Sequence, residues 1–478
     1  MSLGISFAGT VLCSAKPQDA TSSSPSQPFV AQPVELSPGE VPLSFGDTNK
    51  VWTLPELVDE ALEHNPTTTQ AWEQANAAAA QVGVAKSAYA PKVTLGVSGT
   101  AAHDTEAGYL GAQEINQLNA APQLQIQYLL LDFGARKAGL ALTRFNLLNQ
   151  NFTFNRALQQ VVLGVMTSYY NLDAAKVEVE NAETALNLTE ATLQAAKIKR
   201  KTGLTNITDE IQAQQSVEQS KFNLENALGL RSTAEIQLAS SLGLPGNVKI
   251  HVAPPSNPPA LEALEQEVDK LIDLAFHQRP DLAAKYYLWQ AQLAAVDQAE
   301  ANRWPTLTTG VNLQRTYYQA HEEGLGSNSG HFDDASALVT FRFDLFDGGY
   351  KNSQVATSRH LAEAAKADLL NSELGVVSDV VTSFVTFKTA VKKMSAAQAL
   401  VAASQKSFDS IQISYRNGLK SILDLLAAQS NLNAAQSTLS QAQKDLFSSS
   451  AVLSNATGSL LASRPTSAVS STPLNPEQ

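Results

Sequence analysis

Cysteine is almost absent from this chain, which has one in 478 residues, at Cys13. No disulfide can therefore form within one molecule. Charged residues make up 16% and aromatic residues 7%, and the charged share is low for a compact soluble domain. The formal net charge is −12, so the sequence lacks the basic surface that nucleic-acid binding requires. These shortages favour long helices rich in Ala, Gln, Ser and Leu, and they argue against nucleic acid as a partner.

Cys13 directly follows an apolar run, residues 3–12, that has the length of the hydrophobic part of a secretory signal, although no basic residue precedes it. Cleavage after Ala15 would remove Cys13 and leave a mature chain without cysteine. A lipoprotein signal would instead keep Cys13 as the lipidated first residue. Both alternatives stay open, and in either case we expect an exported protein whose residues 1–15 act as a signal peptide.

Long hydrophobic runs are also missing. No stretch of the sequence reaches the 18 or more consecutive apolar residues of a membrane-spanning helix. Closed β-barrels are the other structure that satisfies every backbone hydrogen bond in lipid. If the protein lies in a membrane, we therefore expect it to cross as strands.

Residues for catalysis or metal binding are not gathered in the sequence. The seven histidines show no close metal-ligand spacing, and no glycine-rich loop joins a strand to a helix around a phosphate. The histidines are His64, His103, His251, His277, His321, His331 and His360. We therefore expect no enzyme activity, no metal and no cofactor.

A capping box predicts the start of the first helix, with Thr53 as the N-cap and Glu56 three residues later. That helix is expected to run to Tyr89, where Pro91 ends it. A second copy is expected between Pro280 and Pro305.

Proline is absent from two long segments, residues 123–244 and 306–464. Helical periodicity within them predicts helices over residues 135–201 and 350–417, each of about 67 residues and on the order of 100 Å. Compact domains do not need helices of this length. The segments predict extended helical structure.

Each long helix is expected to end at a short glycine turn, at Gly203 or Gly418, because a helix C-terminus often needs a left-handed residue. A second helix then returns to Leu242 or to Ser459. The pattern predicts an αα-hairpin that is built twice.

The return helix of the second hairpin carries a heptad pattern. Leucines recur at every seventh position and small residues lie between them, which predicts a closely packed coiled-coil seam. The leucines are Leu425, Leu432, Leu439, Leu446, Leu453 and Leu460, and the small residues are Ala428, Ala435, Ala442, Ser449 and Ala456. The first hairpin has a looser version of the same pattern. A plain two-helix coiled coil would explain this seam equally well.

The sequence is internally duplicated. Matching positions recur at a nearly constant separation, which grows by a single inserted residue between the early pairs and the later ones. The pairs are Pro66 with Pro280, Pro91 with Pro305, Gly134 with Gly349, Gly203 with Gly418, Asp209 with Asp424 and Gly243 with Gly458. This period is far too long for a solenoid repeat, so the sequence predicts a duplicated, domain-sized half. We expect function to lie where the two halves meet.

Two runs in each half alternate apolar with polar or small residues, as strands with one apolar and one wet face do. These runs are residues 91–98, 124–130, 307–313 and 339–345. Arg342 and Asp344 lie on the wet face. The runs fit transmembrane barrel strands, although periodicity alone also fits a soluble antiparallel sheet.

The strands are expected to meet the helices at prolines and glycines, namely Pro91, Gly134, Pro305, Gly348 and Gly349. We expect residues 1–15 to form a signal peptide, 16–50 a disordered arm, 51–245 the first repeat, 246–267 a Pro-rich belt between the repeats, 268–460 the second repeat and 461–478 a disordered tail.

The order of helix, strand pair and long helical hairpin, given twice, resembles the TolC family of outer-membrane efflux channels. The resemblance extends from about residue 46 to residue 462. It rests on LDFG at 131–134 and LFDGG at 345–349, where strand passes to helix, and on the hairpin tips GLTNITD at 203–209 and YRNGLKSILDLL at 415–426.

The resemblance implies a fold that combines a coiled-coil helical tunnel with a β-barrel. Four transmembrane strands per chain are too few to close a barrel, so a homotrimer with twelve strands is expected in the outer membrane. Partners implied by the family are a periplasmic adaptor (membrane fusion) protein and an inner-membrane pump of the RND or ABC type. The chain would be the exit duct for drugs or secreted proteins.

The hairpin tips are where the resemblance implies a gate. Residues at the tips hold the periplasmic mouth of such channels shut, and the matching positions are Thr208, Asp209, Tyr415 and Lys420. Asp424 matches an aspartate that forms a ring in the constriction, where three carboxylates would attract cations. The simpler alternative is that Asp209 and Asp424 stabilise helix N-termini.

The turns Gly203–Leu204 and Gly418–Leu419 resemble the places where the family meets the adaptor protein. Two other classes of function stay open from the sequence. One is a coiled-coil spacer or adhesin of the cell envelope that has no pore, and the other is a periplasmic enzyme, against which the lack of a catalytic site weighs.

Overall fold

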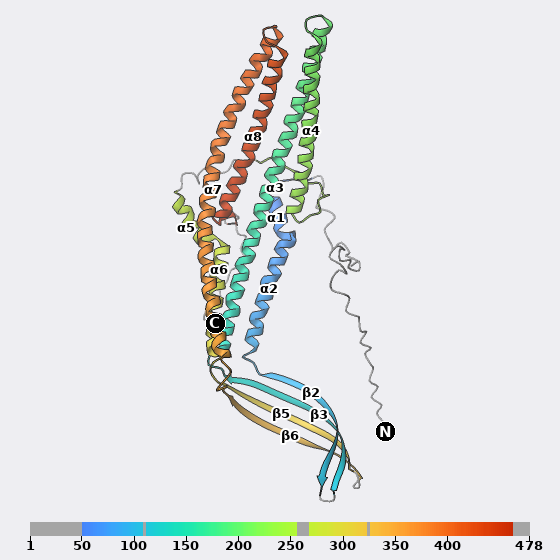
Figure 1. Ribbon diagram of the computed structural model, residues 1–478, viewed down its shortest axis with the longest axis vertical. Helices are drawn as coiled ribbons and strands as arrows, with labels where there is room; N and C mark the ends of the chain where they lie inside the picture. The colour runs from blue at the N-terminus through green and yellow to red at the C-terminus, as the bar shows by residue number, and fades with distance from the viewer. Residues whose placement is uncertain (1–49, 109–110, 256–266, 323–325, 462–478) are drawn as a thin grey trace. The chain divides into compact units, whose positions relative to one another are not determined.

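The computed structural model describes residues 50–108, 111–255, 267–322 and 326–461. The expected signal peptide with Cys13, nearly all of the N-terminal arm, part of the Pro-rich belt and nearly all of the C-terminal tail lie outside the described residues. The described part forms two halves with the same order of elements (Figure 1).

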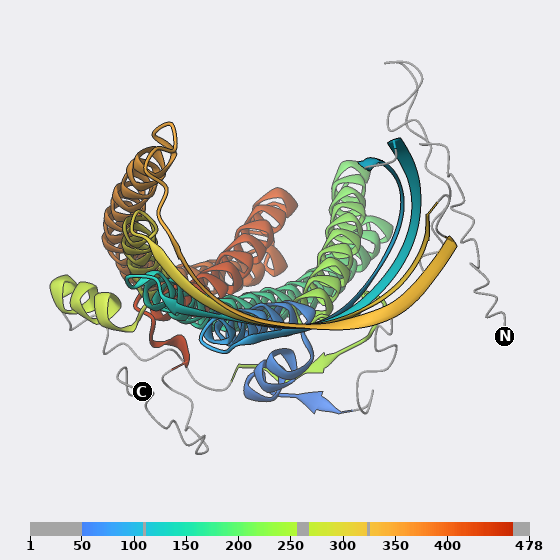
Figure 2. The same ribbon diagram turned by 90° about the horizontal axis from the view of Figure 1, so that it is seen from below.

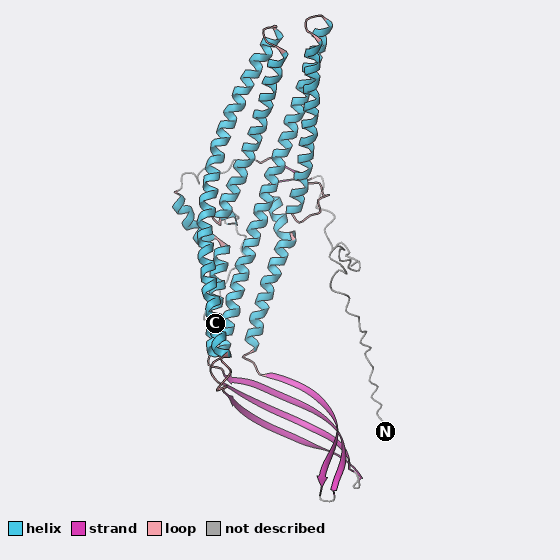
Figure 3. Cartoon of the chain, in the orientation of Figure 1, coloured by secondary structure: helices cyan, strands magenta, loops and turns pink. Residues whose placement is uncertain are grey.

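The first half consists of β1 (Val51–Trp52), α1 (Leu54–His64), α2 (Pro66–Ser87), β2 (Lys92–Gly108), β3 (Gly111–Leu131), α3 (Ala135–Lys201) and α4 (Ile207–Ser241). The second half consists of β4 (His251–Val252), α5 (Val268–Gln278), α6 (Pro280–Ala301), β5 (Thr306–Glu322), β6 (Gly326–Arg342), α7 (Tyr350–Arg416), α8 (Ile422–Ala456) and η2 (Ser459–Leu461). Figure 3 shows the strands joined to one end of the helices.

The first helix of each half is split in two, which corrects the expectation of one helix from Thr53 to Tyr89. The expected capping box is present at its start, where the Thr53 N–H donates to Glu56 at 2.9 Å. Asn65 then ends α1 in an extended conformation, because the proline that follows disfavours a helical residue before it. Pro66 begins α2, and the Asn65 side chain caps it by accepting from the Thr67 N–H at 2.8 Å.

Four long strands form one antiparallel sheet in the order β2-β3-β5-β6. Strands were expected at these places but shorter: the structure gives 17 residues in β2, β5 and β6 and 21 in β3, because each pair continues to its connecting turn. Asp344, expected in the last strand, lies beyond its end at Arg342. Figure 2 shows that the four strands follow one curved surface.

The sheet has one apolar and one polar face, as the alternation predicted. Val93, Leu95 and Val97 on β2 are 60%, 76% and 75% exposed, and the opposite face of this strand carries Lys92 and Thr94. Large apolar side chains without cover need an environment other than water.

The long helices match the sequence closely. Both α3 and α7 have 67 residues, and both α4 and α8 have 35. The expected heptad positions of α8 are buried, except for Leu439, which is half-buried, and Leu460, which follows the helix in η2. Buried small residues such as Ala435, 1% exposed, allow α7 and α8 to pack closely.

Contacts between α3 and the helices α6 and α8 join the two halves. The Ser437 hydroxyl of α8 donates to Glu178 of α3 at 2.6 Å, and the Ser440 hydroxyl donates to the Ala174 carbonyl at 3.3 Å. Tyr170 of α3 stacks on Phe447 of α8 with 5.0 Å between the ring centroids. The interface therefore combines apolar packing with side-chain hydrogen bonds.

The part of the expected belt that is described lies against α3. β4 pairs in parallel with β1, and the Tyr169 hydroxyl donates to the Ala253 carbonyl at 2.6 Å. Burial, together with the negative charge of Asp173, raises the pKa of Tyr169 to about 12, so this hydroxyl keeps its proton. The Lys176 ammonium donates to the Val252 carbonyl at 3.2 Å.

Among the described helices, α7 contains an 18-residue window whose length and mean hydropathy of 1.4 would suffice to cross a membrane. The same helix contributes Val376, Val380, Phe384 and Phe387 to a buried cluster with α5 and α8. Packing within the protein therefore accounts for apolar residues in this helix.

Candidate functional site

Each helical hairpin ends in a tip, which we define as residues 199–209 in the first hairpin and 414–424 in the second. Gly203 and Gly418 have φ angles of +74° and +76°, the left-handed conformation that glycine adopts without strain. The N–H of the next residue, Leu204 or Leu419, donates to the carbonyl five residues earlier at 2.8 Å. Both leucine side chains are more than three-quarters exposed, as an external contact would require.

The first tip starts α4 with a polar cap. The Asn206 side chain accepts from the Asp209 N–H at 3.3 Å, and the Thr205 hydroxyl donates to the Asp209 carboxylate. Asp209 is half-buried, whereas Thr208 is exposed. The local role of Asp209 is thus to order the first turn of α4.

The second tip has the same arrangement, with a lysine beside the aspartate. The Ser421 hydroxyl accepts from the Asp424 N–H at 3.2 Å, while the Asp424 carboxylate accepts from the Ser421 N–H at 3.0 Å. The Lys420 ammonium lies 3.8 Å from the same carboxylate. The backbone and hydroxyl hydrogen bonds from Ser421, helped by Lys420, lower the pKa of Asp424 below its usual range. Asp424 therefore carries a negative charge at neutral pH, and its side chain is 41% exposed.

Tyr415 is 8% exposed and belongs to a buried cluster that both hairpins share at their tips. Burial raises the pKa of Tyr415, and the negative charge of Asp209 raises it further. Within the described residues of one chain, however, the Tyr415 hydroxyl has no hydrogen bond to Asp209, and Lys420 contacts Asp424 instead of Asp209.

Lys199 contacts Tyr415 and was not among the site residues expected from the sequence. Its ammonium lies 3.8 Å from the centroid of the Tyr415 ring and donates to the Tyr415 carbonyl at 3.3 Å. The only sign of it in the sequence is the basic run Lys199-Arg200-Lys201 at the end of α3. A run of this kind normally indicates no more than a favourable charge at a helix C-terminus.

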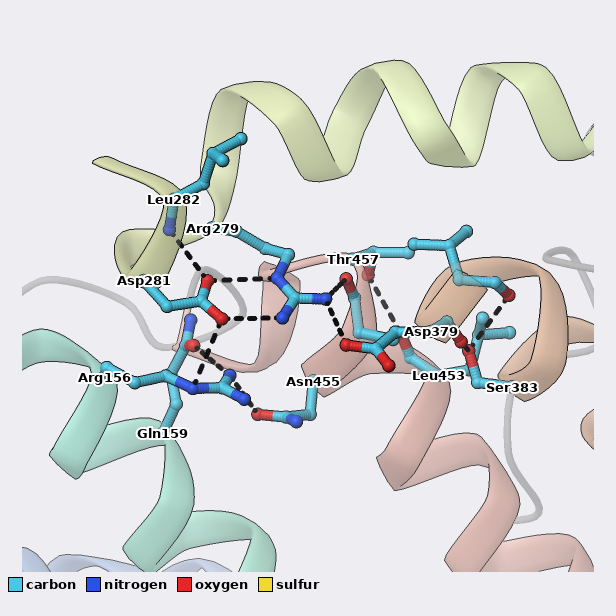
Figure 4. Close-up of polar contacts among 12 residues, drawn as sticks. Arg156, Gln159, Arg279, Asp281, Leu282, Asp379, Ser383, Leu453, Asn455 and Thr457 are labelled. Atoms are coloured by element: carbon cyan, nitrogen blue, oxygen red, sulfur yellow. Dashed lines mark hydrogen bonds and ion pairs between the residues drawn. The ribbon is translucent and has the colours of Figure 1, made fainter. Parts of the chain in front are cut away.

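A charged cluster, which we call the Arg279 cluster, was also missed (Figure 4). The guanidinium of Arg279 is 5% exposed and donates to both carboxylate oxygens of Asp281, at 3.0 and 2.6 Å. It also donates to Asp379 of α7 at 3.0 Å and to the Ala456 carbonyl at the end of α8 at 3.4 Å. Burial alone would lower the pKa of Arg279, but the two carboxylates raise it, so the group stays charged.

Arg156 connects α3 to this cluster. Its guanidinium lies 3.8 Å from Asp281 and donates to Asn455 at 3.2 Å, while Gln159 donates to the Gly458 carbonyl at 3.1 Å (Figure 4). The cluster therefore links α3, α6, α7 and the end of α8.

The first half has a neutral counterpart of the Arg279 cluster. Asn65 occupies the position in the first half that Arg279 occupies in the second, and its amide donates to the Ser241 carbonyl at 3.0 Å. Ser241 corresponds to Ala456, so both halves brace the same turn. A side chain in place of Gly458 would come within 2.7 Å of the backbone of Gln278, which explains why this turn carries glycine.

The strand-to-helix transitions contain the residues named from the sequence. Pro91 and Pro305 directly precede β2 and β5. Gly134, Gly348 and Gly349 have φ angles of +99°, +67° and +87° directly before or close to α3 and α7.

Aspartates cap both long helices at these transitions. Asp132 accepts from the Arg136 N–H at 2.7 Å, and Asp347 accepts from the Lys351 N–H at 2.9 Å. The rings of Phe133 and Trp304 stack there with 5.7 Å between their centroids. Within the described ranges, no three His, Cys, Asp or Glu side chains are close enough to hold a metal ion.

Comparison with known proteins identifies the family. The model of the outer membrane efflux protein family matches residues 57–244 and 271–459, one match for each half. Protein CyaE of Bordetella pertussis is 25% identical over 377 residues, which cover 79% of this chain and 77% of that protein. Outer membrane protein TolC of Escherichia coli is 24% identical over 411 residues, which cover 81% and 78%.

Solved structures have the same fold. The structure of CusC has a TM-score of 0.72 at 18% identity and covers 85% of this chain and 92% of CusC. The outer membrane protein VceC of Vibrio cholerae has a TM-score of 0.71 at 17% identity, with 85% and 96% covered. The expected fold of helical tunnel and barrel strands is confirmed, and the chain belongs to the outer membrane efflux protein family, whose members are exit ducts in the outer membrane.

Proposed function

We propose that three copies of this chain form a closed channel that acts as the exit duct of a tripartite efflux pump or a type I secretion system. The observation that carries the proposal is the pair of open sheet edges. Within the described chain, β2 and β6 each pair on one side only. An open strand edge is not tolerated in lipid, because its backbone groups would lack hydrogen bonds.

The duplication supplies the missing pairing. Within one chain, β3 of the first half pairs with β5 of the second. The second strand of one half thus pairs with the first strand of the next half. By the same rule, β6 of one chain would pair with β2 of the next chain, and closure after three chains gives a barrel of twelve strands. The alternation along β2 then puts Val93, Leu95 and Val97 against lipid and Lys92 and Thr94 in an aqueous lumen.

The helices support closure by the same argument. Ser437 and Ser440 of α8 contact Glu178 and the Ala174 carbonyl of α3 within a chain. The equivalent residues of the other repeat are Phe222 and Glu225 on α4 and Lys393 and Thr389 on α7. At the seam between two chains, Phe222 would therefore lie against Lys393, and Glu225 against Thr389.

Surfaces at these shifted positions are free in one chain. Phe222 is 68% exposed, and Lys393 lines two open grooves of about 790 and 870 Å³. The acidic Glu225 and the basic Lys393 would lie about one helical turn apart on the facing helices of this seam, within reach of a long side chain.

The tips form the gate in this proposal. Thr208, Asp209, Tyr415 and Lys420 would link neighbouring hairpins, with Asp209 of one chain reaching Lys420 of another when the tips converge. Lys420 is a point charge without the planar fork of arginine, so this link would be weaker than an arginine pair. Three copies of Asp424 would form a carboxylate ring around the narrowest point.

The partners follow from the same duct. The exposed Leu204 and Leu419, beside Gly203 and Gly418, suit contact with a periplasmic adaptor protein. An RND or ABC pump of the inner membrane would supply the energy for transport. The family description points to efflux, and the two kinds of cargo, drugs and secreted proteins, follow from the resemblance to the TolC family.

Planar bilayers test the proposal directly. The purified protein is expected to insert as a trimer and to conduct in small steps with a preference for cations, because Asp424 rings the narrowest point. The alternative, a coiled-coil spacer or adhesin without a pore, predicts no conductance from a trimeric sample.

Variants at the tips test the proposed link between Asp209 and Lys420. Removing Asp209 and Lys420 together, with Asp209→Ala and Lys420→Ser, is expected to raise conductance several-fold, and the single variants should be non-additive because the two groups share one contact. A combined variant that conducts like the parent would remove this pair from the gate.

A further inference from the structure

Lys199 joins the two hairpins of one chain at their tips. It lies in the last turn of α3, whereas Tyr415 lies in the last turn of α7, 216 residues later. The ammonium group lies 3.8 Å from the centroid of the Tyr415 ring and 3.3 Å from the Tyr415 carbonyl oxygen. One side chain thus holds both the ring and the backbone of its partner.

The surroundings make this contact stronger than an exposed ion pair. Tyr415 is 8% exposed and packs with Leu193 and Ala196 of α3 and with Ile422 of α8. The cation also lies at the C-terminus of α7, where the helix dipole places partial negative charge. Ring, carbonyl and dipole all favour the same position of the ammonium.

The duplication shows that this contact belongs to one kind of seam only. The counterparts of Lys199 and Tyr415 in the other repeat are Ser414 and Arg200. The Ser414 hydroxyl donates to the Ser410 carbonyl of its own helix at 2.9 Å, and Arg200 pairs with Glu210 at 2.5 Å. An equivalent cation–ring contact therefore cannot form where the second hairpin meets the first hairpin of the next chain.

We propose that Lys199 is a latch that keeps the two hairpins of each chain together in the closed tip, and that the trimer holds three such latches and not six. The proposal rests on the gated duct described above. It assigns the holding role of Tyr415 to its ring and carbonyl, so the hydroxyl is not needed for this contact.

Four variants test the latch in planar bilayers. Lys199→Met removes the charge and is expected to raise the conductance of the closed channel about tenfold, because the ring and the helix end each contribute a few-fold to the closed population. Lys199→Arg keeps a cation over the ring and should conduct like the parent. Lys201→Met removes the same charge two residues away, from an exposed position, and should also conduct like the parent. Tyr415→Leu keeps the carbonyl but removes the ring, so it should open the channel less than Lys199→Met does.

Trimer melting in detergent is measured on the same samples, and Lys199→Gln replaces Lys199→Met if the latter does not assemble. The latch is refuted if Lys199→Met conducts like the parent while the combined variant Asp209→Ala with Lys420→Ser opens the channel. That result would still support the proposed gate. It is refuted equally if Lys201→Met opens the channel as much, because the cause would then be the charge at the mouth. A trimeric parent without conductance overturns both the duct and the latch.

Discussion

Replacement of Arg279 measures how much the charged cluster at the junction of α6, α7 and α8 contributes to stability. Arg279→Met keeps most of the side-chain volume but removes the donors to Asp281, Asp379 and the Ala456 carbonyl. Hydrogen bonds to charged groups contribute about 1.5–3 kcal/mol each when buried. The carboxylates here are 32% and 57% exposed, so water would replace part of the loss. We expect a loss of about 2 kcal/mol per chain.

That loss converts into a melting shift. Unfolding entropy of about 2.1 cal/mol/K per residue, over the roughly 400 residues that the structure describes, gives about 0.8 kcal/mol/K, so a loss of about 2 kcal/mol lowers the Tm by about 2–3 °C. Far-ultraviolet circular dichroism of the detergent-solubilised trimer, followed as the temperature is raised, measures this shift through the loss of helix.

The chain itself supplies the matched control. Asn65 holds the equivalent turn of the first half with one neutral hydrogen bond to the Ser241 carbonyl at 3.0 Å. Arg279→Asn should therefore restore the brace to the Ala456 carbonyl without the carboxylate contacts and should melt between the parent and Arg279→Met. If both variants melt like the parent, the cluster does not contribute to stability; if Arg279→Asn is as damaging as Arg279→Met, the brace is not transferable between the halves.

Three further predictions concern the pore and the seams. Asp424→Asn keeps a capping side chain but removes its charge, so cation preference should fall without opening the channel. Because the pKa of Asp424 is lowered, the parent should keep its cation preference through the usual aspartate range and lose it only at more acidic pH. Reversal potentials measured at a series of pH values will show this. Ala435→Leu inserts a bulky side chain at a position only 1% exposed and should cost about 1–3 kcal/mol per chain, so an unchanged melting temperature would place Ala435 outside the seam. Glu225→Lys and Lys393→Glu should each weaken the trimer on semi-native gels and the double reversal should restore it; failure of that rescue would argue against this pairing between chains.

The architecture could be predicted from the sequence because it depends on periodic features. Proline-free segments predicted α3 and α7 at 67 residues each, and the heptads predicted the buried face of α8. Glycine at 203 and 418 marked both tips because few other residues adopt a positive φ. Strand length was underestimated, since the polar ends of β5 and β6 lack the apolar alternation that indicates a strand in lipid.

Contacts between distant residues were beyond the sequence. Lys199 and Tyr415 are 216 residues apart, and neither motif nor spacing relates them. Arg279 precedes a proline in a position that reads as a helix start, and its partner Asp379 lies 100 residues later in the middle of α7. Such pairs depend on how the hairpins pack, which periodicity does not determine.

The two halves share their geometry and differ in their polar contacts, and some of these differences fall at the contact between the two hairpins. A trimer of duplicated chains has six similar hairpins, so seams within a chain alternate with seams between chains. Lys199 with Tyr415, and Arg156 with Asn455, strengthen the seam within a chain. The counterparts of the first pair, Ser414 and Arg200, make local contacts instead. Identical halves would give six equal seams in the proposed trimer, whereas Lys199 and Arg156 add contacts to the seam within each chain. We therefore expect opening of the tips to begin between chains.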